Sequence, residues 1–132
     1  MKLLNNSEYG AVSISKQVIE KLVLDELLIH EDIVSSCSPN GKVLKRGFFT
    51  GLNELLSSVE VHDSDEGMKI VFYIIVKFGE SINEISNAIF DGIEQNLEMF
   101  HLSKPIEIKA YIKGVQAEHI SKRNIEVIRT NE

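Results

Sequence analysis

The sequence predicts a single small α+β domain with a roughly four-stranded, mainly antiparallel sheet and two main helices. The chain has 132 residues, the size of one ordinary domain, and 43% of them are hydrophobic. Two segments carry apolar residues at the three- and four-residue spacing of an amphipathic helix, and others alternate as strands do. The predicted order is β-α-(irregular)-β-β-α-β.

The first predicted elements are a short strand and a helix. Residues 10–15, GAVSIS, place Val12 and Ile14 on one side of a strand. Ser15 has a side chain that can cap the helix that follows, over residues 16–30. The apolar stripe of this helix consists of Ile19, Leu22, Val23 and Leu27, with Leu24 and Leu28 beside them.

Residues 31–57 have no clear periodic pattern, and we treat them as irregular. SPNGK, residues 38–42, predicts a turn because Pro39 and Gly41 both interrupt regular structure. KVLKRGFF, residues 42–49, is compatible with a strand. GLNELLSS, residues 51–58, fits either a short helix or a second edge segment.

Residues 58–78 predict a β-hairpin whose turn is DSDEG, residues 63–67. Its second strand is apolar on both faces. One face carries Met68, Ile70, Phe72, Ile74, Val76 and Phe78, and the other carries Val71, Tyr73 and Ile75. Two helices cover one face of such a sheet but hardly both. We therefore expect a homo-oligomer or a standing protein partner on the second face, unless residues 31–57 or the C-terminal tail cover it.

The second helix begins at a capping box, SINE, in which Ser81 and Glu84 each bond to the other's backbone N–H. Its apolar stripe consists of Ile82, Ile85, Ile89, Ile93, Leu97 and Phe100. Gly92 lies inside this helix, where glycine costs about 1 kcal/mol relative to alanine. A close contact between the helix and a strand would explain it.

Residues 104–115 predict the last strand. Its buried face carries Ile106, Ile108, Ala110 and Ile112, and its wetter face carries Glu107, Lys109, Tyr111 and Lys113. The polar tail, residues 118–132, has three open alternatives: it pairs, docks or frays. We expect one domain over residues 1–132, with a core of residues 9–117 and this tail.

Charge and composition restrict the class of partner. The net charge of -6 disfavours non-specific attraction to nucleic acid or anionic lipid. The single cysteine, Cys37, excludes an internal disulfide, and we expect it to be a small buried residue. The first ten residues lack the apolar stretch of a signal peptide, and the longest apolar run, residues 70–76, is too short to cross a bilayer. We expect a soluble, cytoplasmic protein without direct membrane insertion.

Two loops have the outline of ligand sites but lack the residues that such sites need. Gly79 joins a strand to a helix, as in phosphate loops, but Glu80 would repel an anion and the capping box uses the N–H groups. The acidic turn that starts at Asp63 fails the calcium-loop pattern, since its glycine is at position five instead of six. A G-x-x-G loop of an RNA-binding KH domain does not occur in the sequence.

The sequence contains no recognisable catalytic or metal-binding motif. The histidines, His30, His62, His101 and His119, are scattered and form no zinc pattern. No serine sits in a G-x-S-x-G motif, and Cys37 has no recognisable partner. Glu31 and Asp32 near a helix end are interpreted as a solvated pair. We therefore predict no catalytic, cofactor-binding or metal-binding residue, no cofactor and no enzyme activity.

Several segments in their order resemble the alkaline shock protein family, also called the envelope stress response family, of Gram-positive bacteria. The strongest is MKIVFYIIVKFGESINEISNAIFDGIEQNLEMF, a long apolar strand, an aromatic-Gly pair and a helix rich in Ile and Glu. GAVSIS, GFFTGLNELLSSVEV and IEIKAYIKGV resemble the family's opening, middle and last strand, so the likeness covers roughly residues 9–117. The chain departs from the family at EDIVSSCSP, at SSVEV, at Phe78 and in NAIFDGI, as a divergent member would.

The resemblance implies a non-enzymatic cytoplasmic protein of envelope stress and homeostasis. Such a protein acts as an adaptor or scaffold through protein contacts, with a protein partner that can be membrane-anchored, and it can self-associate. It would then lie at the membrane only through that partner. The alternative is a regulatory binding module for a small metabolite or nucleic acid, which a deep pocket with convergent polar groups would favour.

Overall fold

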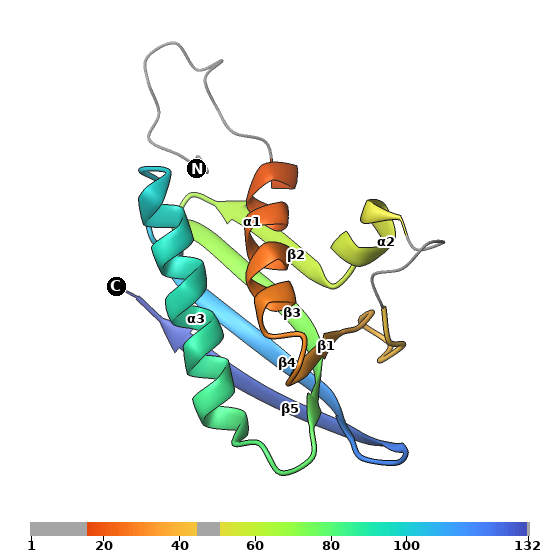
Figure 1. The fold of residues 1–132 in the computed structure, drawn as a ribbon. Helices are drawn as coiled ribbons and strands as arrows, with labels where there is room; N and C mark the ends of the chain where they lie inside the picture. The colour runs from red at the N-terminus through yellow and green to blue at the C-terminus, as the bar shows by residue number, and fades with distance from the viewer. Residues whose placement is uncertain (1–15, 45–50, 132) are drawn as a thin grey trace.

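The computed structural model describes residues 16–44 and 51–131 (Figure 1). Its elements in chain order are α1 (Lys16–Ile29), β1 (Val34–Ser36), α2 (Leu52–Leu56), β2 (Val59–Ser64), β3 (Gly67–Lys77), α3 (Ile82–Met99), β4 (Glu107–Gln116) and β5 (Ile120–Thr130). The predicted α+β class is therefore confirmed for the described part of the chain.

The strands form one five-stranded mixed sheet in the order β1-β3-β4-β5, with β2 also paired to β3. β1 and β2 lie end to end along one edge of β3, at Val34↔Val76 and Val59↔Phe72, and both are antiparallel to it. β4 lies along the other edge and is parallel to β3, which α3 makes possible by connecting the two strands. β5 then pairs antiparallel with β4.

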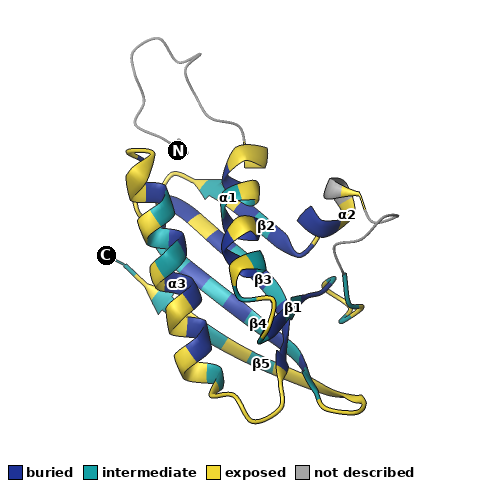
Figure 2. Ribbon diagram, viewed as in Figure 1, coloured by how far each residue is buried: buried dark blue, intermediate teal, exposed yellow. Residues whose placement is uncertain are grey.

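Helices α1 and α3 cover one face of the sheet, and Figure 2 shows their buried residues turned toward it. The core between them contains Phe72 and Phe90, whose rings meet edge to face with centroids 5.9 Å apart. Both side chains are fully buried. An apolar stripe on each helix thus meets the apolar side of β3, as the periodicity predicts.

The turn before α3 has the form that its sequence predicts. Gly79 has a φ of 94°, in the left-handed region that favours glycine, and this turns the chain at the end of β3. Ser81 is the N-cap of α3, and its Oγ accepts a 3.2 Å hydrogen bond from the backbone N–H of Glu84. Phe78 was expected on the core face of β3, which is wrong: it follows the last residue of the strand and is 71% exposed.

Two strands were not predicted. β1 lies inside residues 31–57, which we expected to be irregular, and β5 is formed by the polar tail, which pairs. The sheet therefore has five strands instead of about four. Of the two alternatives for residues 51–58, a short helix or a second edge segment, the structure has the short helix α2. The strand expected at residues 10–15, the Ser15 cap and most of residues 42–49 lie outside the described residues, although Val43 forms a single bridge with Cys37.

The close contact expected at Gly92 exists, but its partner is a helix and not a strand. A Cβ on Gly92 would overlap the carboxyl group of Glu26, which projects from α1. Glu26 is 7% exposed, so this carboxyl group lies between α1 and α3. Glycine at position 92 thus provides the space for a buried acidic side chain.

Candidate functional site

The face of the sheet that α1 and α3 do not cover, here called the outer face, carries the second set of β3 side chains. Ile75 is buried, with the side chains of Ile75 and Ile120 flanking the backbone of Gly114. Val71 and Tyr73 are half-buried. At Ile75 the alternative that the C-terminal tail covers this face therefore holds, whereas the surface around Tyr73 remains accessible.

A stacked tyrosine pair occupies the middle of the outer face. Tyr73 of β3 is directly opposite Tyr111 of β4 in the parallel register. Their rings are nearly parallel, at 9°, with centroids 5.2 Å apart. Such a pair presents a rigid aromatic surface with hydroxyl groups at its edge, which is a common feature of protein interfaces.

Polar groups on four strands join this pair into a connected row. The Tyr73 hydroxyl donates to Glu60 Oε2 at 3.1 Å, and His62 Nε2 lies 3.2 Å from Glu60 Oε1. On the other side, Lys109 Nζ lies 3.5 Å from the Tyr111 hydroxyl and 5.4 Å from its ring centroid. Lys109 also lies 3.6 Å from Glu126 on β5. The row alternates acidic, aromatic and basic groups across the sheet.

The environment of this row favours the protonated forms of Tyr73 and Lys109. Burial, together with the hydrogen bond and the negative charge of Glu60, raises the pKa of Tyr73 to about 12. The hydrogen bond to Tyr111 raises the pKa of Lys109. The tyrosine is therefore a neutral donor and the lysine a cation at neutral pH. These forms suit recognition by hydrogen bonds and charge better than nucleophilic chemistry.

Cys37, directly after β1, is a buried thiol in the segment beside Tyr73. Its backbone N–H donates to the Tyr73 carbonyl at 3.0 Å, which extends β1 along β3. Burial raises the pKa of the thiol to about 12, so it carries its proton at neutral pH. The expectation of a small buried residue is confirmed.

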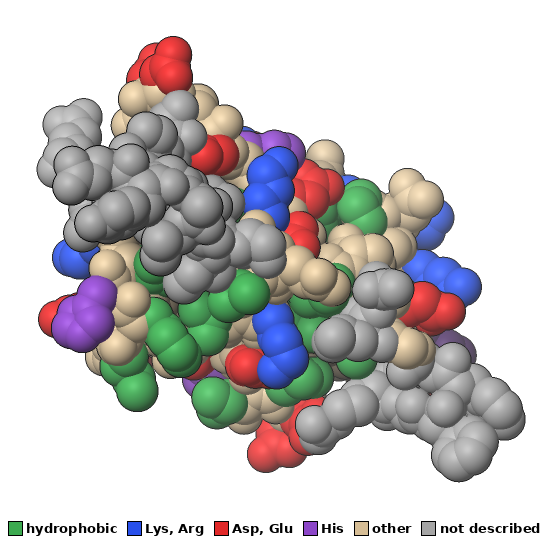
Figure 3. All heavy atoms as spheres, turned by 90° about the horizontal axis from the view of Figure 1, so that it is seen from above, with side chains coloured by type: hydrophobic (Ala, Val, Ile, Leu, Met, Phe, Trp, Pro, Cys, Tyr) green, Lys and Arg blue, Asp and Glu red, His purple; other side chains and the backbone are tan. Residues whose placement is uncertain are grey.

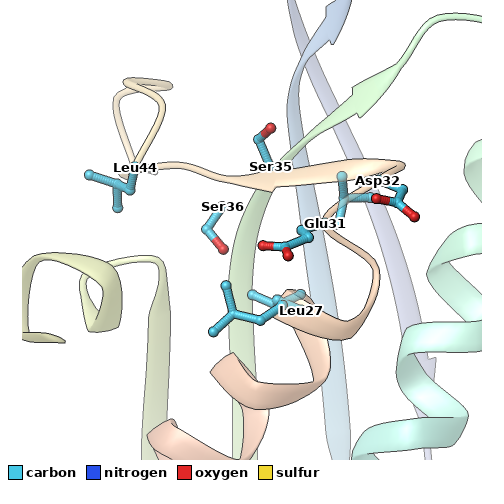
Figure 4. Close-up of a pocket in the computed structure, with 8 residues that line it drawn as sticks. Leu27, Glu31, Asp32, Ser35, Ser36 and Leu44 are labelled. Atoms are coloured by element: carbon cyan, nitrogen blue, oxygen red, sulfur yellow. The ribbon is translucent and has the colours of Figure 1, made fainter. Parts of the chain in front are cut away.

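A cavity of about 500 Å³ opens between the end of α1 and β1 (Figure 4). Its lining is Leu27, Leu28, Glu31, Asp32, Val34, Ser35, Ser36 and Leu44. The carboxylate of Glu31 points between Ser36 and Leu27. Acidic and hydroxyl groups thus meet leucines in this cavity, a lining that suits a ligand with hydroxyl or cationic groups and repels an anion.

The residues weighed as ligand candidates do not come together. His30 lies beside Glu26, His62 lies beside Glu60, His101 follows the C-cap of α3, and His119 is in the turn between β4 and β5. Within residues 16–44 and 51–131, no group of three or more His, Cys, Asp or Glu side chains is arranged to hold a metal ion. The turn at Asp65 and Glu66 is an exposed hairpin tip, as expected.

The sequence pattern did not directly indicate the polar cluster that Glu26 forms with His30 and Asn96 between α1 and α3. Glu26 Oε2 lies 3.0 Å from His30 Nε2, and Glu26 Oε1 accepts a 3.4 Å hydrogen bond from Asn96 on α3. Glu26 lies among the apolar positions of α1, where a carboxylate is unusual. Gly92, placed inside a helix, was the one available signal of a close contact. The group connects two helices and is remote from the outer face.

Exposed apolar side chains also occur where α1 begins and α3 ends. Figure 3 shows this end of the molecule, with hydrophobic side chains beside charged ones. Val18, Met99 and Phe100 are 44%, 75% and 55% exposed. None of the three can provide acid–base chemistry, so these side chains offer contact area alone.

Comparison with known protein families gives a match over most of the chain. A family model for the alkaline shock protein 23 family, described as having a cell envelope-related function, matches residues 4–117. Comparisons with curated proteins and with solved structures gave no match. In the described part of the chain, no helix has the length and apolarity needed to span a membrane. The match includes the whole stretch on which the resemblance rested, and the chain belongs to the alkaline shock protein 23 family, whose function is related to the cell envelope.

Proposed function

We propose that this protein is a non-enzymatic cytoplasmic adaptor of the cell envelope that binds a protein partner through its outer face. The family match supports the relation to the envelope. The row centred on Tyr73 and Tyr111 is the observation that carries the proposal. It offers aromatic area and charges of both signs, which together favour a protein ligand.

The chemistry of the described residues supports the non-enzymatic part of the proposal. The buried thiol of Cys37 and the hydroxyl of Tyr73 both have raised pKa values, which is the opposite of what an activated nucleophile needs. With a net charge of -6, the chain is also a poor ligand for nucleic acid. A partner anchored in the membrane would bring the protein to the envelope.

Photo-cross-linking in cells tests the proposal. A photoreactive amino acid replaces Lys69, which is exposed on the outer face, and in a matched control it replaces Gln95, which is exposed on α3. We expect an adduct with one membrane-fraction protein from position 69 only. Tyr111→Ala should abolish that adduct while thermal melting shows that the fold persists. Equal adducts from both positions, or none from position 69, would exclude the outer face as the binding surface.

The cavity beside β1 supports a second candidate, a binding module for a small metabolite. Its acidic lining favours a polyhydroxylated or cationic compound. A compound that raises the melting temperature of the protein, and loses this effect in Glu31→Gln or Asp32→Asn, would support this candidate. A compound that protects both variants as well as the unaltered protein would bind elsewhere.

A further inference from the structure

A second cavity lies at the end of the outer face where the parallel strands β3 and β4 both end. Its volume is about 410 Å³. Its lining is Glu31, Asp32, Ile33, Ser35, Lys77, Phe78, Gln116 and Ala117. Ser35 pairs with Ile75, and Lys77 pairs with Gln116, so β1, β3 and β4 each contribute an outer-face residue. The loop between α1 and β1 adds two carboxylates.

The second cavity and the cavity beside β1 lie on opposite sides of this strand. Val34 and Ser36, which line the cavity beside β1, are on the side that the helices cover. Lys77, which lines the second cavity, is on the outer face. Figure 4 shows the carboxylate of Asp32 pointing away from that of Glu31. Asp32 is exposed, so its carboxylate is accessible to a group that binds at the outer face.

An exposed aromatic ring lines the same cavity. Phe78 directly follows β3 and is 71% exposed. Its backbone N–H donates to the carbonyl of Gln116 at 2.8 Å, and Gly79 then turns the chain, so the backbone that carries the ring is held at the end of the sheet. The face of such a ring attracts cations. An accessible phenyl ring and an accessible carboxylate thus line one cavity.

We propose that this second cavity, here called the anchor site, binds an arginine side chain of the protein partner. The guanidinium group bonds to the carboxylate of Asp32 and stacks on the ring of Phe78, while its alkyl stem packs against Ile33 and Ala117. A guanidinium group can make both contacts at once, because it is planar and carries its donors at the edge, whereas an ammonium group is a point charge. The side-chain oxygen of Gln116 can accept a further N–H group.

The charge of the anchor site favours one cation. Glu31 and Asp32 give the lining two negative charges, and Lys77 gives it one positive charge. The chain as a whole has a net charge of -6, which also attracts a basic segment. A phosphate or carboxylate ligand would instead meet a lining of net negative charge.

The position of the anchor site favours a protein segment over a free small molecule. Most of the lining is exposed, whereas a small-molecule pocket buries most of its ligand. Tyr73 and Lys77 lie on the same side of β3, and their Cα atoms are roughly 13 Å apart at the rise of a strand. An extended segment of about four residues therefore reaches from the tyrosine pair to the anchor site. The inference rests on the proposed function and names one chemical group of that partner.

NMR titration of the purified full chain tests the chemistry of the anchor site. The probe is an acetylated pentapeptide with one central arginine among glycine and serine residues. We expect this peptide, at millimolar concentration, to shift the backbone signals of Ile33, Phe78 and Ala117. A peptide with citrulline, the uncharged analogue of arginine, should leave them in place, and a lysine peptide should bind less tightly. No shift with the arginine peptide, or equal shifts with the citrulline peptide, overturns the proposal.

Substitutions locate the site. Asp32→Asn and Phe78→Ala should each weaken binding of the arginine peptide about tenfold, because each removes one of the two main contacts. Both side chains are exposed, so thermal melting should show that the fold persists. Glu98→Gln, which removes a negative charge from an exposed position on α3, is the matched control and should have no effect. If Asp32→Asn and Glu98→Gln weaken binding equally, the attraction is general and the anchor site is excluded.

The photo-cross-linking assay shows whether the partner uses the anchor site. With the photoreactive amino acid at position 69, Asp32→Lys should reduce the partner adduct about tenfold, because it sets a second cation against the arginine. An adduct that persists undiminished would overturn the anchor site and leave the proposed function intact. The proposed function itself fails if position 69 gives no adduct without the Asp32 substitution.

Discussion

The carboxyl group of Glu26 on α1 occupies the space in which a side chain on Gly92 of α3 would lie. The acid is buried, and His30 and Asn96 provide its polar contacts. Glycine in the middle of a helix is unfavourable by itself. Its presence shows that the approach of the two helices, and not local helix propensity, determines this position.

Gly92→Ala should therefore destabilise the protein by about 1–3 kcal/mol, because a Cβ forces the buried carboxylate to move. In a Glu26→Ala background the same change should be neutral or stabilise by about 0.5–1 kcal/mol, since only helix propensity remains. Urea denaturation of the two single variants and the double variant measures the coupling. Gln95→Ala, on the exposed side of α3, is the control. A gain in stability from Gly92→Ala alone would contradict the contact.

The cap of α3 gives a second prediction. Ser81→Ala removes the acceptor for the backbone N–H of Glu84 and should lower the free energy of unfolding by about 0.5–2 kcal/mol. Glu84→Ala should cost less, because the Ser81 side chain remains as the acceptor. Urea midpoints decide, and equal stability of both variants and the unaltered protein would mean that this hydrogen bond does not stabilise the helix start.

The sequence predicted best the elements that bury a periodic face. β3 and α3 follow from the alternation around Phe72 and the spacing around Ile89, and both side chains are fully buried. β1 has only three residues, too few for a pattern. β5 is an edge strand whose side chains are mostly polar and exposed, and its apolar contribution to the core is limited to the partly buried Ile125 and Val127, too few for a clear alternating pattern.

The outer face could be predicted only in part. The alternation placed Tyr73 and Tyr111 on faces away from the core, and both predictions are correct. Their stacking depends on the parallel register of β3 and β4, which α3 separates along the chain. The contact of Glu26 with Gly92 has the same origin, because it depends on how α1 and α3 pack. No local pattern encodes either relation.

Cys37 predicts a pH dependence of stability. Burial raises its pKa from 9.0 to about 12, so the folded protein holds the thiol proton more tightly than the unfolded chain. This contribution is fully present below pH 9, and it is lost as the pH rises through about 12. The free energy of unfolding should therefore fall over this interval.

Thiol reactivity measures the same effect directly. At pH 8 the native protein should not react with a disulfide reagent, whereas the protein in denaturant should react with one equivalent. Cys37→Ala should reduce the alkaline loss of stability, with the remainder due to Tyr73 and other groups. Rapid reaction of the native protein would show that the thiol is accessible.

The last prediction concerns Arg129, which connects β5 to α3. One guanidinium nitrogen lies 2.8 Å from Asp91 Oδ1 and 3.2 Å from Glu94 Oε1, and the other donates to Asn87 at 3.0 Å. The guanidinium carbon also lies 5.2 Å from the ring centroid of Phe90. Arg129→Ala should cost about 1–3 kcal/mol, because Glu94, whose side chain is only 13% exposed, loses its cation.

Arg129→Lys should recover only part of this loss, since an ammonium group cannot bond in the same plane to all of these acceptors. Arg123→Ala on the same strand is the matched control. Its side chain bonds to the backbone carbonyl of its neighbour Lys122, and its removal should change stability by less than about 0.5 kcal/mol. Urea midpoints, measured on dilute protein, compare the stability of the Arg129 and Arg123 variants with that of the unaltered protein. If both alanine variants lose the same stability, the bonds of Arg129 to α3 contribute nothing measurable to the stability of the fold.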